Sequence, residues 1–230
     1  MIKTVPTIRG SAQARLLLYR LLTSRLTDAE QKLLSADLSA WEQLLSSLEA
    51  ALASDAQAKS DETVLTTAFD QIDRSTRTGL QKQIERLTGQ SQWLGVKATG
   101  LLDSFVVEHK KLIKSVTRDH LDKIGLAINR GVREGKLQKD IAKDIQQMTT
   151  LSKRRAKLIA RAAPLQYSGD LTKHHQTSAG IMKYRWQTSQ DERVRKSHRA
   201  RNNKIYSWDT PGPHPRSEVL CRCDAVPVLD

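Results

Sequence analysis

The sequence predicts a mainly α-helical protein, in which an N-terminal helical body containing a coiled-coil-like hairpin is followed by a small C-terminal α+β module. Three observations predict this fold class. Only 4% of the 230 residues are aromatic, which makes a large β-sandwich or β-barrel core hard to build. Apolar residues recur at helical spacing as far as about residue 163. Beyond Pro164, glycine, proline, histidine, tryptophan and tyrosine concentrate instead.

The N-terminal part is expected to hold three helices, the last two paired as an antiparallel hairpin. The first lies in the Leu- and Arg-rich residues 10–26, after which Thr27 and Asp28 offer a cap for the second. The second has an apolar seam at heptad spacing, which suits pairing with another helix: Leu34, Leu38, Trp41, Leu45, Leu48 and Leu52. The third, capped by Ser60 and Asp61, has an apolar stripe of its own: Leu65, Phe69, Ile72, Thr76, Leu80, Ile84 and Leu87.

The rest of the chain is expected to change from helices to a mixed module. Residues 88–91, Gly95 and Gly100 are expected to form a connection, and the long helix after it should end near residues 131–135, where two glycines lie. Two shorter helices should follow, at residues 136–145 and from Ser152 to Ala163, the second stopped by Pro164. Residues 184–188 and 204–208 have strand-like patterns, separated by an Asn202-Asn203 turn. We therefore predict a helical body at residues 1–135 and a C-terminal module at residues 136–230.

Positive charge is concentrated in the last third of the chain. The formal net charge is +13, and residues 151–230 carry 16 basic and 7 acidic side chains. Such a region gains affinity for double-stranded DNA by releasing counterions, without reading its sequence. The candidate phosphate contacts are Lys153, Arg154, Arg155, Lys157, Arg195, Lys196, Arg199 and Arg201. A solvated basic face, or one that docks an acidic protein, is the alternative.

Four side chains near the C-terminus are candidate zinc ligands. Thiolates and neutral imidazoles are the ligand types that structural zinc prefers, and the set is His198, His214, Cys221 and Cys223. Two cysteines that are two residues apart are poorly placed to bridge each other. The alternative is that the cysteines alternate across a strand, one buried and one exposed, and that the histidines form hydrogen bonds. In that case Asp191-Glu192-Arg193 organises the turn through charge-assisted hydrogen bonds, with Arg193 or Arg195 forking onto a carboxylate. We expect no other cofactor.

Enzymatic activity is not expected. His198, Asn202 and His214 superficially match a metal-dependent nuclease, but no pair of acidic residues with metal-binding spacing accompanies them. The chain has no Gly-rich phosphate loop and no arguable Ser/His/Asp arrangement. It also has no long apolar run, so we expect a protein that is soluble at synthesis and has no membrane partner.

The order of motifs near the C-terminus resembles that of a known phage family. Residues 184–195 read Tyr-Arg-Trp-Gln-Thr-Ser-Gln-Asp-Glu-Arg-Val-Arg, and His198, Asn202-Asn203-Lys204, His214-Pro215 and Cys221-Arg222-Cys223 follow in that order. This series resembles the C-terminal signature of the phage Mu F-like head-morphogenesis family over residues 184–226, and more weakly from about residue 136. Asn202-Asn203 stands where relatives have Asp-Gly.

The resemblance implies a role in the particle of a tailed phage. Family membership implies a minor head protein, present in few copies, that associates with the portal protein and the major capsid protein at the capsid interior. It further implies assembly in the host cytoplasm and a part in head assembly or in handling the packaged double-stranded DNA. The helical seam adds an expectation of self-association.

Overall fold

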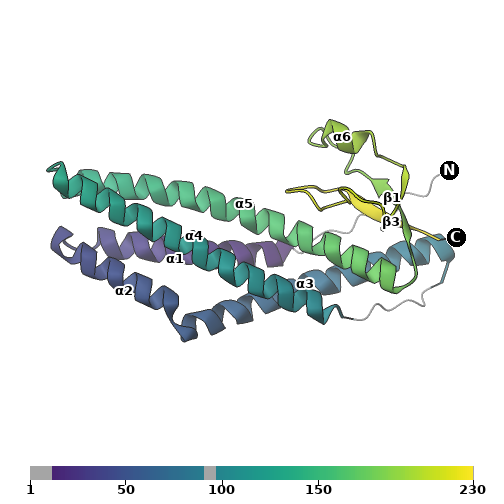
Figure 1. Ribbon diagram of the computed structural model, residues 1–230, viewed down its shortest axis with the longest axis horizontal. Helices are drawn as coiled ribbons and strands as arrows, with labels where there is room; N and C mark the ends of the chain where they lie inside the picture. The colour runs from purple at the N-terminus through teal and green to yellow at the C-terminus, as the bar shows by residue number, and fades with distance from the viewer. Residues whose placement is uncertain (1–11, 91–96, 230) are drawn as a thin grey trace. The chain divides into compact units, whose positions relative to one another are not determined.

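The structure is a computed structural model that describes residues 12–90 and 97–229 (Figure 1). Helices dominate it, as the sequence predicts, and a small sheet forms near the C-terminus. The elements in chain order are α1 (Ala12–Leu34), a short 3-10 helix η1 (Leu38–Ala40), α2 (Trp41–Ala53), α3 (Asp55–Thr88), α4 (Thr99–Arg133), α5 (Gln138–Ser178), β1 (Lys183–Gln187), α6 (Lys196–Arg199), β2 (Ile205–Ser207) and β3 (Asp224–Val228). The predicted fold class is therefore confirmed.

The described chain divides into two compact units. The first, which we call the helical unit, comprises residues 15–67 and 106–160. The second, the sheet unit, comprises residues 12–14, 68–90, 97–105 and 161–229. Helices α3, α4 and α5 each contribute residues to both units. The functional division at residue 135 stays a prediction.

The helical unit has an apolar core built from four helices. Its buried members are Ala29, Leu33, Trp41, Leu45, Leu121, Ile124, Ile128, Ile141 and Ile145. A Cβ at Gly131 of α4 would lie 2.5 Å from Ile141 of α5, so a larger residue there would force the isoleucine to move. No helix in the described ranges is both long enough and apolar enough to cross a lipid bilayer.

The first helix boundary differs from the prediction. Helix α1 continues through Thr27 and ends at Leu34, so the predicted seam is divided between α1, η1 and α2. Thr27 does not cap a helix, because its hydroxyl donates to the carbonyl of Thr23 one turn earlier, at 3.0 Å. At the actual break, the carbonyl of Ala36 accepts hydrogen bonds from the side chains of Trp41 and Gln138, at 3.1 and 3.0 Å.

The third helix begins earlier than predicted. Helix α3 starts at Asp55, and the hydroxyl of Ser54 accepts a hydrogen bond from the backbone N–H of Gln57, as an N-cap serine does. Asp61, predicted as part of a cap, lies inside the helix and forms an ion pair with Arg25 of α1. The end at Thr88 agrees with the prediction. Helix α4 begins at Thr99, so Gly100, which was expected in the connection, lies in its first turn; residues 91–96, with Gly95, lie outside the described residues.

The predicted stop at Pro164 is wrong. Helix α5 is continuous from Gln138 to Ser178, with Pro164 inside it, and so replaces the two predicted short helices. An interior proline costs a helix about 3 kcal/mol. Tyr167 and Leu171, both fully buried, continue the buried face beyond the proline. Their burial, at roughly 1.5–3 kcal/mol for each large apolar side chain, offsets that cost.

The C-terminal sheet contains both predicted strands and a third. β1 is central and pairs antiparallel with β2 on one side and β3 on the other, with Tyr184 opposite both Tyr206 and Pro227. Asn203 has a φ of 63°, which agrees with its predicted place in a turn. Its backbone N–H donates to the carbonyl of Trp186 at 2.7 Å, which extends the pairing of β1 beyond β2.

Candidate functional site

The sheet unit is built around an aromatic and sulfur-containing core. Alternate residues of β1, Tyr184 and Trp186, are buried on one face of the strand. They belong to a cluster that also contains Trp208, Cys221, Cys223 and Ala225. Tyr184 and Trp208 lie with their ring centroids 4.2 Å apart. Both cysteines are therefore part of the core of this unit.

A buried glutamine joins α5 to the sheet within this unit. The side-chain amide of Gln176 donates to the carbonyl of Ala225 in β3 at 2.8 Å. Its oxygen accepts a hydrogen bond from the indole N–H of Trp208 at 2.9 Å. Gln176 is fully buried, so these two bonds replace those that water would otherwise make.

A buried ion pair fixes the segment that precedes the cysteines. The guanidinium of Arg216 pairs with the carboxylate of Asp224 at the start of β3 and also donates to the hydroxyl of Ser168 in α5. A Cβ at Gly169 of α5 would lie 2.8 Å from the Cβ of Arg216 and 3.2 Å from the carbonyl of Pro215. Glycine at this position thus permits the close approach of the helix and the segment.

Three of the four predicted metal ligands come together. His198 lies on α6, and its Nδ1 is 3.6 Å from Sγ of Cys221 and 3.5 Å from Sγ of Cys223. All three side chains are buried, with 2–3% of their surface exposed. The other ring nitrogen of His198, Nε2, is 3.2 Å from the carboxylate of Glu218. We call His198, Cys221 and Cys223 the His-Cys-Cys cluster.

The two sulfur atoms in this cluster share one tightly held proton, so that a proton on Cys221 is easily lost. The hydrogen bond from the Cys223 thiol, helped by the backbone N–H groups of Cys223 and Arg216, lowers the pKa of Cys221 to about 5. The same bond raises the pKa of Cys223, because its proton is held between the sulfurs. The cluster thus favours a thiolate at Cys221, the form in which cysteine binds metals.

His214, the fourth predicted ligand, has other partners. Its Nδ1 lies 2.8 Å from the hydroxyl of Tyr184, and its ring lies 5.0 Å from that of Trp208, measured between centroids. Burial, with Lys173 and Arg201 nearby, lowers the pKa of His214, which favours the neutral imidazole. Asn202 accepts hydrogen bonds from the backbone and hydroxyl of Thr188. His198, Asn202 and His214 are thus occupied separately, which gives the nuclease arrangement no support.

The turn that contains Asp191 is held by a residue that the sequence did not suggest. The side chain of Arg222, between the two cysteines, makes two contacts of 2.7 Å with the carboxylate of Asp191. Hydrogen bonding to Arg222 lowers the pKa of Asp191. Arg193 contributes its backbone N–H, and Arg195 pairs with Glu218 at 3.3 Å. Arg195 thus pairs with a carboxylate, as predicted, but that carboxylate belongs to Glu218, and the fork onto Asp191 comes from Arg222.

The first group of predicted phosphate contacts lies on α5 in the helical unit. Lys153 pairs with Glu30 at 3.3 Å, and Arg155 pairs with Asp119 at 3.0 Å. Arg154 and Lys157 are exposed, and among the described residues no ion pair or hydrogen bond holds their side chains. Of these four residues, only Arg154 and Lys157 therefore have charged groups that are free to contact phosphates.

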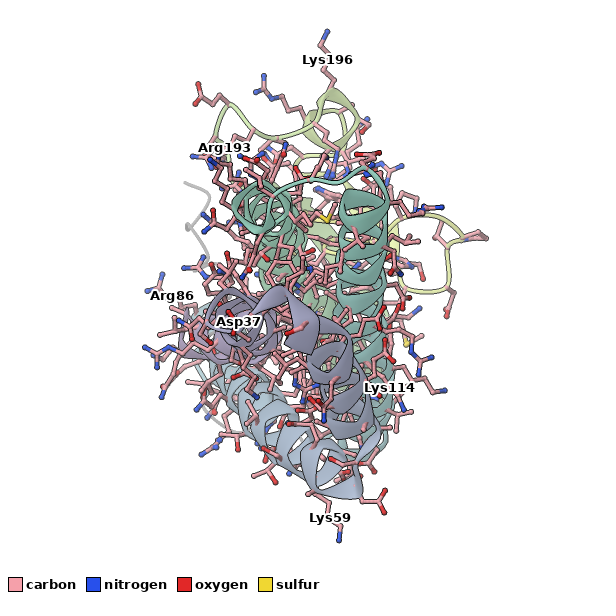
Figure 2. The ribbon with its side chains drawn as sticks, turned by 90° about the vertical axis from the view of Figure 1, so that its left-hand side faces the viewer. Asp37, Lys59, Arg86, Lys114, Arg193 and Lys196 are labelled. Carbon is pink, nitrogen blue, oxygen red and sulfur yellow. The ribbon has the colours of Figure 1, made fainter. Side chains whose placement is uncertain are left out.

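The second group lies in the sheet unit, and most of its side chains interact with other residues of the same unit. Arg199 donates to backbone carbonyls of the Asp191 turn, and Arg201 donates to that of Pro213. The guanidinium of Arg201 also lies 5.2 Å from the ring centre of Trp186. Lys196 extends away from the first turn of α6 (Figure 2), and within the described part of the chain no carboxylate pairs with it.

The sequence did not mark four residues that hold the site together: Gln176, Arg216, Glu218 and Arg222. Each acts through a partner that is distant in the sequence: 20 residues separate Glu218 from His198, and 49 separate Gln176 from Ala225. No local pattern marks such a pair. Only the position of Glu218, between the His214-Pro215 and Cys221-Arg222-Cys223 motifs, could have indicated that it belongs to the site.

Comparison with known proteins supports the resemblance noted in the sequence. Residues 122–226 match the profile of the family described as Phage Mu protein F like protein. A protein of Haemophilus influenzae, whose name is "Uncharacterized protein", is 37% identical over 123 residues. This match covers 52% of the chain but only 28% of the relative, so the chain spans less than a third of that relative's length. No solved structure matches the chain.

The family match includes the end of α4, all of α5 and the three strands as far as Val226. The His-Cys-Cys cluster, Glu218 and the Arg216–Asp224 pair lie inside it. Residues 122–226 of this chain are therefore similar to the Phage Mu protein F like family.

Proposed function

We propose that this chain is a minor capsid protein that acts in head morphogenesis of a Mu-like tailed bacteriophage. The match of residues 122–226 to the Phage Mu protein F like family is the observation that carries this proposal. We accordingly expect the chain inside the virion and, during assembly, in the host cytoplasm. The role is structural: the protein helps build the head and catalyses no reaction.

The portal protein and the major capsid protein are the partners that we propose for the helical unit. This unit exposes large apolar side chains, among them Leu126 at 70% and Val132 at 54% of their surface. Both line an open groove of about 820 Å³ between η1 and α4, together with Leu38 and Glu42. An exposed apolar groove of this kind suits contact with another protein.

Double-stranded DNA is the further partner that we propose, bound through phosphates and without sequence preference. Arg154, Lys157 and Lys196 support this proposal, because their cations are exposed and have no partner in the described parts of the chain. Neutralising phosphates releases counterions, so each such contact steepens the dependence of affinity on salt.

Fractionation of phage particles tests the assembly role. Heads and finished particles are purified from lysates of a host that produces the phage, and the chain is quantified by mass spectrometry against the major capsid protein. We expect the chain in both fractions at a few copies per head. Its absence from heads and from finished particles alike would contradict the proposal.

Salt titration tests the DNA contact separately. The affinity of the full chain for random duplex DNA is measured between about 50 and 200 mM salt, and Arg154→Gln/Lys157→Gln is expected to lower the slope by about 2. Lys32→Gln/Lys123→Gln is the matched control, since both lysines belong to the same unit and already pair with aspartates. Absence of binding at low salt would remove DNA and leave protein partners alone.

A further inference from the structure

We propose that the His-Cys-Cys cluster is a zinc site, in which Nδ1 of His198 and the thiolates of Cys221 and Cys223 are the protein ligands. This inference does not depend on the proposed role in phage heads. Its starting point is that one donor atom from each of the three residues lies within 4.8 Å of the other two, and that all three residues are buried.

The distances between the donor atoms fit tetrahedral coordination. Zinc lies about 2.3 Å from a thiolate and about 2.0–2.1 Å from an imidazole nitrogen. At the tetrahedral angle, these bond lengths place the nitrogen about 3.6 Å from each sulfur. In the structure, Nδ1 of His198 is 3.6 Å from one sulfur and 3.5 Å from the other. Zinc could thus bind with little movement of the histidine and the cysteines.

The residues around the cluster prepare these atoms to bind a cation. Because the carboxylate of Glu218 lies 3.2 Å from Nε2 of His198, it accepts a proton carried on that nitrogen, which leaves the lone pair of Nδ1 facing the sulfurs. Glu218 is itself held by Arg195. The backbone N–H of Arg216 donates to Sγ of Cys221 at 3.3 Å, which stabilises a thiolate there.

The ligand types and the charge balance both favour zinc. Two thiolates and one neutral imidazole form the soft set that selects zinc over magnesium or calcium. Their two negative charges neutralise a divalent ion, so the site carries no net charge in the core of the unit. The described residues supply three ligands, and we assign the fourth position to a water molecule. The metal would then tie α6 to the segment that leads into β3.

Metal content and cobalt spectroscopy of the full chain test this site. Protein purified without chelator is expected to contain about one equivalent of zinc by elemental analysis. After removal of the metal, titration with Co²⁺ alone should produce thiolate-to-cobalt charge-transfer absorption in the near ultraviolet, and Zn²⁺ should abolish it. Less than about a tenth of an equivalent of zinc, together with no such absorption at excess Co²⁺, would overturn the proposal.

Variants identify the ligands and the supporting carboxylate. We expect Cys221→Ser, Cys223→Ser and His198→Gln each to abolish or greatly weaken the cobalt absorption. Glu218→Gln should keep the absorption but lower the affinity by about 10–100-fold, the usual effect of losing the hydrogen-bond partner of a ligating histidine. His174→Gln is the matched control, because this exposed histidine lies on α5 outside the cluster, and its affinity should not change.

Further measurements keep these outcomes interpretable. Far-ultraviolet circular dichroism checks that each variant keeps its helices, which make up most of the structure. His214→Ala should bind cobalt as the unaltered chain does, because His214 instead contacts Tyr184. If the Cys221→Ser/Cys223→Ser double variant keeps its helices and retains zinc with unchanged affinity, the metal is bound elsewhere and the proposal fails.

Discussion

Each of the two units of this protein is stabilised internally by a different kind of interaction. In the helical unit, the apolar cluster around Trp41 consists of this Trp with Leu, Ile and Ala, and its members recur at helical spacing along four helices. In the sheet unit, buried polar groups lie among the aromatic rings: Gln176, His198 and the Arg216–Asp224 pair. Apolar packing tolerates exchange between similar residues, whereas a buried polar network fails when one partner is lost.

The largest effect is expected from breaking the buried ion pair. Asp224→Asn should lower the free energy of unfolding by about 3–5 kcal/mol, because it leaves the charge of Arg216 buried without its counter-charge. Asp209→Asn, an exposed aspartate in the same unit, should change it by less than about 0.5 kcal/mol. Urea unfolding measures both. Equal effects would mean that the pair is not buried in solution.

A core truncation gives the matching test in the helical unit. Ile124→Ala should cost about 2–5 kcal/mol, because the side chain is fully buried and a cavity remains. Ile124→Val should cost only about 0.5–1.5 kcal/mol, since apolar packing tolerates a small loss of volume. The two variants are compared by urea unfolding, and an Ile124→Val variant as unstable as Ile124→Ala would contradict this description of the unit.

A buried histidine of the helical unit sharpens the comparison. Burial, with Lys123 and Lys153 nearby, lowers the pKa of His120 to about 4, whereas a histidine in an unfolded chain has a pKa near 6.5. Between these two pKa values, His120 is protonated in the unfolded chain but not in the folded one. The free energy of unfolding therefore falls as the pH drops from about 6.5 to 4, and below about pH 4 the contribution of His120 does not change further. The expected loss is about 3 kcal/mol.

Substitution isolates this contribution of His120 from that of the acidic groups. The loss of stability between pH 7 and pH 4.5, measured by urea unfolding, should be smaller in His120→Asn than in the unaltered chain by about 2–3 kcal/mol. His174→Asn, at an exposed position, serves as control. If both variants lose as much stability as the unaltered chain, His120 titrates normally in the folded state.

The smallest of these effects is expected at the buried glutamine of the sheet unit. Gln176→Ala should cost about 1–3 kcal/mol, because the indole N–H of Trp208 and the carbonyl of Ala225 lose their partner. Gln138→Ala removes an exposed glutamine that also bonds to a carbonyl and should cost less than about 1 kcal/mol. Thermal unfolding monitored by tryptophan fluorescence compares the stabilities of the two variants. If Gln138→Ala were the less stable variant, the structural role given to Gln176 would be wrong.

Sequence reasoning succeeded where structure depends on local periodicity. The helical class, the long helix α4 and strands β1 and β2 follow from apolar spacing and from the Asn202-Asn203 turn. It failed where tertiary packing overrides a local signal. Pro164 is a strong local helix breaker, yet buried Tyr167 and Leu171 keep α5 intact across it. Thr27 has the chemistry of a cap but uses its hydroxyl inside α1.

The candidate site was predictable in its chemistry but not in its membership. Histidine and cysteine are metal ligands wherever they occur, so their types alone marked the set. Which of them meet depends on the pairing of β1 with β3 and on the path of the chain after Pro215. That path brings Cys221 and Cys223 to His198 and leaves His214 beside Tyr184. The role of Glu218 follows from the same path.

Amide hydrogen exchange of the full chain tests most directly whether the two units are stabilised separately. Asp224→Asn is expected to raise exchange in peptides covering β1, β2 and β3 and to leave exchange in peptides from residues 106–130 of α4 unchanged. Ile124→Ala should do the reverse. If each variant raises exchange equally in both sets of peptides, the protein unfolds as one cooperative body and the distinction between the units fails.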